Sequence, residues 1–423
     1  MDRRRRTTLI LIAGVALAST GHIAAVTIST IAAEALSGSA GLAGTPSATT
    51  VFGAAVGSAV LGWIAGRRGR RIAMTFGYGM AVVGAAIATV ALIGASFPGF
   101  LVGTFFIGFG NSSSLSARYA NADMRPPEGR AAAIGMVVWA STVGAVIGPN
   151  LVPVAGSVAT ALGLPEVTGP YLVPGVVTTT AAILSFLLLR PDPTELADPG
   201  SHPSEAETSA AGGLAEILRR PVVAAALVAL VAGQVVMTLI MTMTPLHLNA
   251  HGHGLADVGL VISAHTFGMF ALSPIAGRLT DRLGSVTIVF AGATVIAVAA
   301  ALTFIAPPDA RDVVLLAMFL LGWGWNLGFV AGSALLTSGL SIAERARTQG
   351  FADALIWSSA AVASAGSGVV VAAAGYATLG LLGLAIVAVP VIVLSSRRAV
   401  LRTAGRPIGG TLIPAEIDVV GEA

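Results

Sequence analysis

Cysteine and lysine are absent from this 423-residue sequence, and only 10% of its residues are charged. The absence of cysteine excludes a disulfide framework, a thiolate metal site and a cysteine nucleophile. An ordinary globular domain has about 25% charged residues, and a soluble chain of this length needs a polar coat around each of its cores. The low charge therefore excludes a soluble nucleic-acid-binding protein, although all 23 basic residues are arginine.

Long apolar runs account for most of the sequence. Hydrophobic residues make up 55% of the chain and the mean hydropathy is +0.87. Charged residues are absent between Arg6 and Glu34 and between Arg220 and Asp257, and about 20 apolar residues suffice to cross a bilayer as a helix. Cutting the chain at its charged and Pro/Gly-rich breaks predicts twelve membrane-spanning helices, at 8–32, 46–65, 72–94, 99–120, 131–153, 171–189, 221–247, 256–276, 286–306, 313–339, 351–373 and 377–395.

A polar stretch divides these helices into two sets of six. Residues 190–213 are rich in Pro, Ser, Glu and Asp and have no apolar face to bury, which is typical of a linker. The halves also resemble each other, since "GWIAGRRGRR" begins at Gly62 and "GRLTDRLGS" begins at Gly277, 215 positions later. We therefore predict an all-α membrane protein of two pseudo-symmetric six-helix bundles, with domains at 1–189, 190–220 (linker), 221–398 and 399–423 (tail).

The distribution of arginine predicts an orientation. If the N-terminus is cytoplasmic, 22 of the 23 arginines fall on the cytoplasmic side of the twelve helices, and only Arg311 falls outside. Such an asymmetry is the positive-inside pattern of membrane proteins. We expect a multi-pass protein of a bacterial inner membrane with both termini in the cytoplasm, the lipid bilayer being its obligatory partner.

Two loops repeat a glycine- and arginine-rich pattern, made of Gly62, Arg67, Gly69 and Arg70 in the first copy and of Gly277, Asp281, Arg282 and Gly284 in the second. Both copies resemble the signature G-x-x-x-D-[RK]-x-G-[RK] of the major facilitator superfamily, and the resemblance covers essentially the whole chain. It implies charge pairs that hold the two halves together at the inner face. Gly66 stands in the acidic position of the first copy, so Arg70 is expected to pair with Asp123 at the end of the fourth helix. A purely topological role for these arginines is the alternative.

The fifth predicted helix contains a second pattern of small residues, formed by Gly135, Gly144, Gly148 and Pro149. It resembles G-x8-G-x3-G-P-x2-G-G of the drug:proton antiporter branch, with Val152 and Pro153 in place of the last two glycines. Small residues allow helices to approach closely, and proline bends a helix. The resemblance implies export, although ordinary small-residue packing would give the same composition. Thr104 stands where proton-coupled members often have an arginine.

Polar residues inside the apolar blocks are costly and are therefore candidates for substrate or proton binding. They are His22, Asn111, Arg118, Gln234, His265, Asn326 and Asp353. Histidine titrates near neutral pH, with an ordinary pKa of about 6.5, and His22 and His265 come from opposite halves, as a shared central site would require. A neutral imidazole bonded to a backbone carbonyl is the alternative for each.

Met237 and Met241 lie one helical turn apart and suit a pocket for apolar ligands, or simple packing. Trp139, Trp323, Trp325 and Trp357 are likewise either pocket or packing residues. The nearby His247, His251 and His253 could bind a transition metal on the outer face, but no fourth ligand is evident. We therefore predict no metal site and no cofactor.

These observations predict a secondary active transporter that exports small amphipathic organic compounds in exchange for protons by alternating access. The alternative is a carrier of the same fold for a metabolite, a siderophore or a metal complex. The sequence has no nucleotide-phosphate loop and no carboxylate pair for catalysis, so we expect no enzyme. The expected partners are a small-molecule substrate, protons and lipid, with no nucleic acid, and two bundles suffice for a monomer.

Overall fold

The computed structural model describes residues 2–125, 130–196, 213–307, 310–338, 340 and 342–396. The predicted tail at 399–423 and the central part of the predicted linker, 197–212, lie outside the described residues. The described residues form helices and short connections and contain no strand, as the sequence predicts.

The first half contains α1 (Arg3–Thr27), α2 (Ser29–Ser37), η1 (Ala40–Leu42), α3 (Thr45–Ile93), α4 (Phe97–Asp123), α5 (Arg130–Ala161), η3 (Glu166–Thr168), α6 (Gly169–Leu188) and η4 (Pro193–Leu196). The second half contains α8 (Leu214–Arg219), α9 (Pro221–Ala250), α10 (Leu255–Phe270), α11 (Ser273–Leu283), α12 (Ser285–Ile305), α13 (Arg311–Leu336), α14 (Ile342–Ala374) and α15 (Ala377–Ser396).

The helices account for the twelve predicted crossings. Within the described ranges, ten segments are long and apolar enough to span a membrane, with 40–93 counted as one. The backbone of α3 breaks at Gly69, where φ is 84° and ψ is 167°, so this segment contains two crossings. The 27-residue α4 packs along both parts of α3 and is the twelfth. The predicted fold of two six-helix bundles is therefore confirmed.

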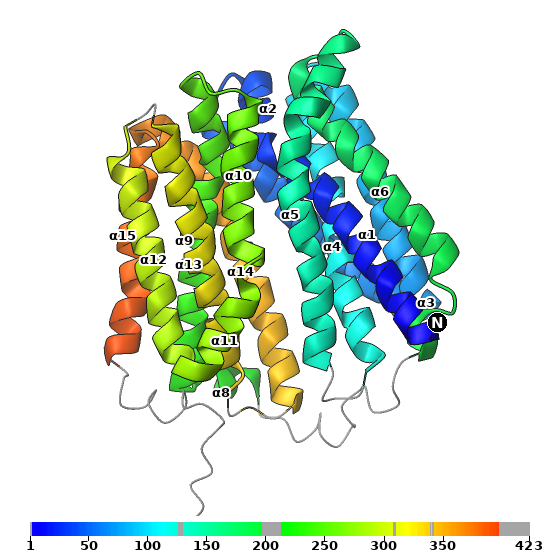
Figure 1. Cartoon of the computed structure of the whole chain (residues 1–423), viewed down its shortest axis with the longest axis vertical. Coiled ribbons are helices and arrows are strands. Elements are labelled where there is room, and N and C mark those ends of the chain that lie inside the picture. The colour runs from blue at the N-terminus through cyan, green and yellow to red at the C-terminus, as the bar shows by residue number, and fades with distance from the viewer. Residues whose placement is uncertain are drawn as a thin grey trace, which may run out of the picture.

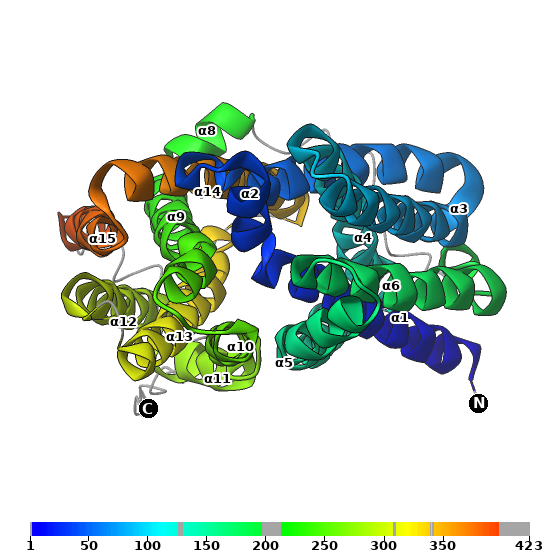
Figure 2. The same ribbon diagram turned by 90° about the horizontal axis from the view of Figure 1, so that it is seen from above.

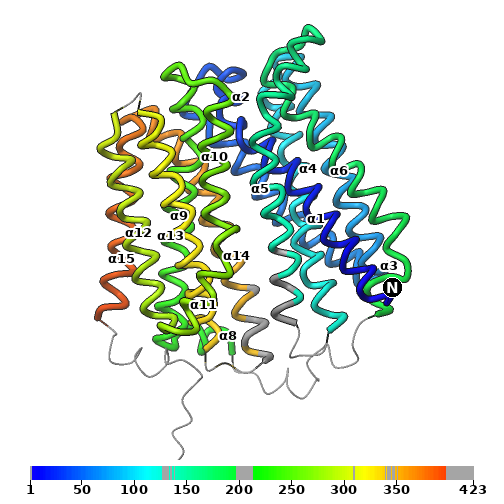
Figure 3. The backbone as a smooth tube through the Cα atoms, in the orientation of Figure 1, coloured from blue at the N-terminus to red at the C-terminus, as the bar shows by residue number. Residues whose placement is uncertain are grey.

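The two bundles stand side by side with their helices running roughly along one direction (Figure 1). Seen from above, α1 and α3 to α6 group apart from α9 to α15, and the short α2 lies beside α9 of the second group (Figure 2). The N-terminus lies at the lower end in Figure 1, and the backbone trace in Figure 3 shows α8 at this end too. We call it the arginine-rich end, because Arg67, Arg68, Arg70, Arg71, Arg219 and Arg220 lie there.

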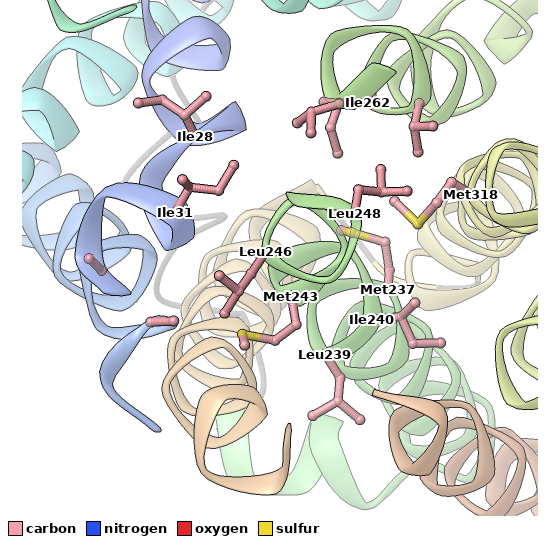
Figure 4. Close-up of a cluster of buried hydrophobic side chains, with 14 of the residues drawn as sticks. Ile28, Ile31, Met237, Leu239, Ile240, Met243, Leu246, Leu248, Ile262 and Met318 are labelled. Carbon is pink, nitrogen blue, oxygen red and sulfur yellow. The ribbon is translucent and has the colours of Figure 1, made fainter. Parts of the chain in front are cut away.

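The opposite end is closed by contacts between the two halves, and we call it the closed end. Ile28 and Ile31 share one buried apolar cluster with Met243 and Leu246 of α9, and Figure 4 draws all four within this group of side chains. The Ser364 hydroxyl of α14 donates a 3.0 Å hydrogen bond to the carbonyl of Gly44. Apolar packing thus joins the bundles at this end.

Glycines set the separation of helices inside the first bundle. A Cβ added to Gly53 of α3 would collide with the backbone of Phe105 in α4, and one added to Gly108 would collide with the backbone of Thr50 and Ala54. The two backbones therefore touch with no side chain between them, as small residues permit in membrane helices.

We expect Gly53→Val to destabilise the protein strongly, because the added side chain must push α4 away from α3. Overpacking of this kind costs about 1–3 kcal/mol or more. Gly79→Val on the same helix is the matched control, since no atom lies within 4 Å of its added Cβ. Thermal unfolding of the purified variants measures the effect; equal midpoints for the two would contradict this account of the packing.

Candidate functional site

A chamber of about 310 Å³ lies between the two bundles. Its wall combines residues of α1, α3, α4 and α5 with residues of α9, α10, α13 and α14. Its polar lining consists mainly of hydroxyl and amide groups, and its apolar lining is rich in aromatic and methionine side chains. The volume lies at the lower end of the range for small-ligand sites, about 300–1,000 Å³.

A vestibule of about 660 Å³ continues from the chamber. The two cavities share five lining residues: Val51, Asn111, Leu115, Arg118 and Trp357. The vestibule reaches Gly62, Ala65 and Arg70 in the direction of the arginine-rich end. A path therefore runs from this end to the middle of the protein, while the other end is closed.

An aromatic wall occupies the side of the chamber that belongs to the second half. The rings of Trp325 and Phe329 stack with centroids 4.7 Å apart and an interplanar angle of 17°, and Phe270 meets Trp325 edge-on. Trp325 Nε1 donates a 2.9 Å hydrogen bond to Gln234 Oε1, and Gln234 Nε2 donates to Thr238 Oγ1 at 3.1 Å. Gln234 thus fixes the orientation of Trp325.

His22 and Asn111 lie on the chamber wall that belongs to the first half. The His22 Nδ1 atom is buried and has no hydrogen-bond partner among the described residues. Both side chains offer hydrogen bonds to a solute. Arg118 lines the same chamber, so the structure brings together four of the candidates that the sequence suggests: His22, Asn111, Arg118 and Gln234.

His265 and Asn326 do not line either cavity. His265 is completely buried, and its Nδ1 lies 2.8 Å from the carbonyl oxygen of Met318 in α13. Asn326 donates to the Met269 carbonyl and to the Ser273 hydroxyl. Both side chains join α13 to neighbouring helices, and the expected shared site of two histidines does not form. The alternative, an imidazole bonded to a backbone carbonyl, describes His265.

Arg118 and Asp353 meet across the two halves at the junction of chamber and vestibule. Arg118 Nη2 of α4 lies 3.6 Å from Asp353 Oδ2 of α14, with side-chain exposures of 22% and 39%. Among the described residues that line the two cavities, Asp353 is the only carboxylate. In the sequence these two residues are separate candidates; only the packing of α4 and α14 shows that they form a pair.

The first glycine-arginine loop carries the expected ion pair, with Arg70 Nη2 2.6 Å from Asp123 Oδ2. Asp192, which follows α6, accepts hydrogen bonds from the backbone amides of Arg70 at 3.1 Å and Arg71 at 2.9 Å. A carboxylate in this position caps the helix that starts after Gly69. Nothing in the sequence marks Asp192 as a partner of residues more than 100 positions earlier.

The remaining loop residues lie at the surface or in turns. The Arg67 guanidinium stacks 4.2 Å from the ring of Trp63. Gly284 has a positive φ of 84°, like Gly69, so the two copies share a backbone turn. Asp281 and Arg282 are exposed, and Gly62 and Gly277 have open space around them.

The small residues of α5 pack against helices on both sides. Gly144 and Gly148 lie directly on the backbone of α1 near Thr20, and the Pro149 carbonyl lies against Gly259 of α10. The surroundings of Gly135 lie outside the described residues. The motif therefore produces close contacts within the first bundle and between the bundles.

The histidines near the closed end are engaged separately. His247 stacks on Tyr376 with ring centroids 4.1 Å apart, and His251 Nδ1 lies 2.7 Å from the His247 carbonyl. His253 lies 3.6 Å from Asp257, which also pairs with Arg311 at 2.7 Å. In the part of the chain that the structure describes, no group of three or more His, Asp or Glu residues is arranged to hold a metal.

Comparisons with known proteins agree with this architecture. Two proteins of Bacillus subtilis (strain 168), the uncharacterized MFS-type transporters YddS and YdeG, are 35% and 34% identical to this chain over 400 residues. Each match covers 93% of this chain; the matches cover 92% of YddS and 93% of YdeG. The riboflavin transporter RfnT of Brucella anthropi is 30% identical over 404 residues, covering 93% of this chain and 96% of that protein.

Solved structures share the fold at low identity. A D-xylose-proton symporter aligns with a TM-score of 0.69 and 16% identity over 90% of this chain and 96% of its own. A bacterial homologue of the lysosomal transporter Spinster, in an inward-facing and occupied conformation, aligns with a TM-score of 0.67 and 16% identity over 95% and 98%. The model of the Major Facilitator Superfamily matches residues 8–365 and 249–413, and the chain belongs to this family of transporters.

Proposed function

We propose that this transporter carries a small amphipathic compound with a planar aromatic ring system across a bacterial inner membrane, by alternating access and at the expense of a proton gradient. The observation that carries the proposal is the chamber, which places a fixed aromatic wall opposite neutral hydrogen-bonding groups. One chain supplies both walls, so a monomer suffices. The arginine-rich end faces the cytoplasm in this proposal, following the positive-inside rule.

The charges of the chamber favour neutral or anionic compounds over lipophilic cations. Arg118 is the one permanently charged side chain among the described residues of its wall, and no carboxylate lies there. A flat heterocycle could stack on Trp325 while its polar groups bond to Asn111, His22 or Arg118. Riboflavin has a planar ring system and a polar side chain, and a relative of this chain is named as a riboflavin transporter. We therefore propose riboflavin as the first compound to test.

Counterflow in proteoliposomes tests the proposal. Vesicles with purified protein are loaded with unlabelled riboflavin and diluted into a trace of radiolabelled riboflavin. We expect transient accumulation of label above that in protein-free liposomes, and competition by other flat heterocycles but not by a linear sugar alcohol. Absence of exchange for every aromatic compound in the panel would overturn the proposal.

Proton-coupled export of lipophilic compounds, as in multidrug resistance, is a second candidate. The close packing of Gly144 and Gly148 on α1 favours it, because these residues belong to the antiporter-like pattern of the fifth crossing. In inside-out vesicles with an acidic lumen, such compounds would dissipate the proton gradient on addition. A gradient that persists when lipophilic dyes are added, but dissipates faster when the lumen is loaded with riboflavin, would favour the first candidate.

A further inference from the structure

We propose that Asp353 is the group that binds the coupling proton, and that the Arg118 guanidinium exchanges between Asp353 and the transported compound. The inference rests on the proposed proton-coupled function and names its residues. It replaces the two histidines of the sequence prediction with a carboxylate–guanidinium pair.

The position of the pair is suited to coupling. Arg118 belongs to the first half and Asp353 to the second, and Arg118 lines both the chamber and the vestibule. Any rocking of one bundle against the other changes the distance between them. A change in the charge of Asp353 therefore acts directly on the contact between the halves.

The contacts of Arg118 leave it free to change partners. Its distance to Asp353, 3.6 Å, exceeds the roughly 2.7–2.9 Å of a tight charge-assisted hydrogen bond. Arg118 Nη2 instead donates to the Tyr119 hydroxyl at 3.1 Å, and Arg118 Nε is buried without a partner among the described residues. Donors of this guanidinium thus remain available to a compound in the chamber.

Apart from Arg118 and Asp353, the charged residue among the described lining of the vestibule is Arg70, which already has an ion-pair partner. Helix α3 contributes Arg70, which is held by Asp123 at 2.6 Å, and α4 contributes Arg118 and Tyr119. No charged residue of α9 or α15 is among the described lining residues. His22 faces the chamber and His265 is bonded to the Met318 carbonyl outside it. Asp353 is therefore the acid that water in the vestibule reaches.

The exchange of Arg118 between Asp353 and the compound makes binding of the proton and binding of the compound favour each other. An ionised Asp353 attracts Arg118, and a protonated Asp353 releases it toward hydrogen-bond acceptors of the compound. Conversely, a compound that engages Arg118 removes the cation that favours the ionised carboxylate. Because such coupling is reciprocal, proton and compound bind together and cross together, as in symport.

A distance measurement without any ligand tests this inference. The chain has no cysteine, so spin labels can be attached through Gly66→Cys and Leu283→Cys, two exposed sites of opposite halves near the arginine-rich end. We expect the distance distribution to differ between mildly acidic and mildly alkaline pH. Asp353→Asn should give the acidic distribution at both pH values, and Arg118→Gln should also remove the response.

Glu216→Gln is the matched control, because it removes an exposed carboxylate of α8 at the same end and should leave the pH response intact. A response that survives in Asp353→Asn, or no response in the double-labelled parent, would overturn the inference. Riboflavin counterflow in the same variants separates the two proposals. A pH response that is lost in Asp353→Asn, together with no riboflavin exchange by the parent, would support the Arg118–Asp353 pair and refute riboflavin as the substrate. Riboflavin exchange by the parent, together with an unaltered pH response in Asp353→Asn, would support riboflavin and refute the pair.

Discussion

Trp325→Ala is expected to weaken riboflavin binding about 10- to 100-fold, because it removes the ring on which a flat heterocycle stacks. Stacking of a base on an aromatic side chain is worth about 1–3 kcal/mol, and about 1.4 kcal/mol corresponds to a tenfold change in affinity. The loss should be large here, since Trp325 is held by Gln234 and supported by Phe329 at 4.7 Å. Quenching of flavin fluorescence on the purified protein measures the dissociation constant.

Two further variants separate stacking from general damage. Trp63→Ala removes a tryptophan that is 62% exposed and outside both cavities, and we expect unchanged binding. Trp325→Phe keeps a ring but loses the hydrogen bond to Gln234, so it should lie between the parent and Trp325→Ala. Equal affinities for Trp325→Ala and Trp63→Ala would show that riboflavin does not stack on this wall.

The fold could be predicted from the sequence because each crossing is encoded locally. A run of apolar residues is long enough to span a bilayer by itself, and loop arginines mark where runs end. The chain from Arg220 to Asp257 shows this clearly, since it has no charge and forms α9 almost throughout. Helix ends differ from prediction by several residues because polar residues such as Arg3 to Arg6 continue the helix beyond its apolar part.

The faces of the helices could not be predicted in the same way. A helix that packs on protein and on lipid is apolar around its whole circumference, so the sequence does not show which side meets the cavity. Gln234 and His265 are both polar residues in apolar helices, yet the first lines the chamber and the second lies between α10 and α13. The pairing of Arg118 with Asp353 likewise depends on how two bundles meet.

Asp192 was missed for a different reason. It follows the sixth crossing in a polar stretch where an acidic residue carries no special meaning. Its role depends on the break at Gly69, which exposes the amides of Arg70 and Arg71. Gly66 stands where the family signature has an acidic residue. Any acidic residue in a loop at the arginine-rich end could take its place, so the sequence alone does not single out Asp192.

Alternating access requires the closed end to open, and this motion can be blocked with a disulfide. The Ala372 Cβ of α14 lies 3.7 Å from the position of a Cβ added to Gly41, within the range of about 3.5–4.5 Å found in disulfides. Gly41→Cys combined with Ala372→Cys should therefore cross-link the two halves on oxidation, and no native cysteine competes. Each single-cysteine variant, treated with the same oxidant, is the control.

Riboflavin counterflow through the oxidised double-cysteine protein, before and after reduction, is the measurement that tests the account most directly. We expect exchange to fall to the level of protein-free liposomes when the cross-link is complete and to return when it is reduced, while the single-cysteine variants exchange normally. Exchange at the parental rate through a completely cross-linked protein would show that the contact between Gly41 and Ala372 need not open, and would contradict transport by alternating access through this chamber.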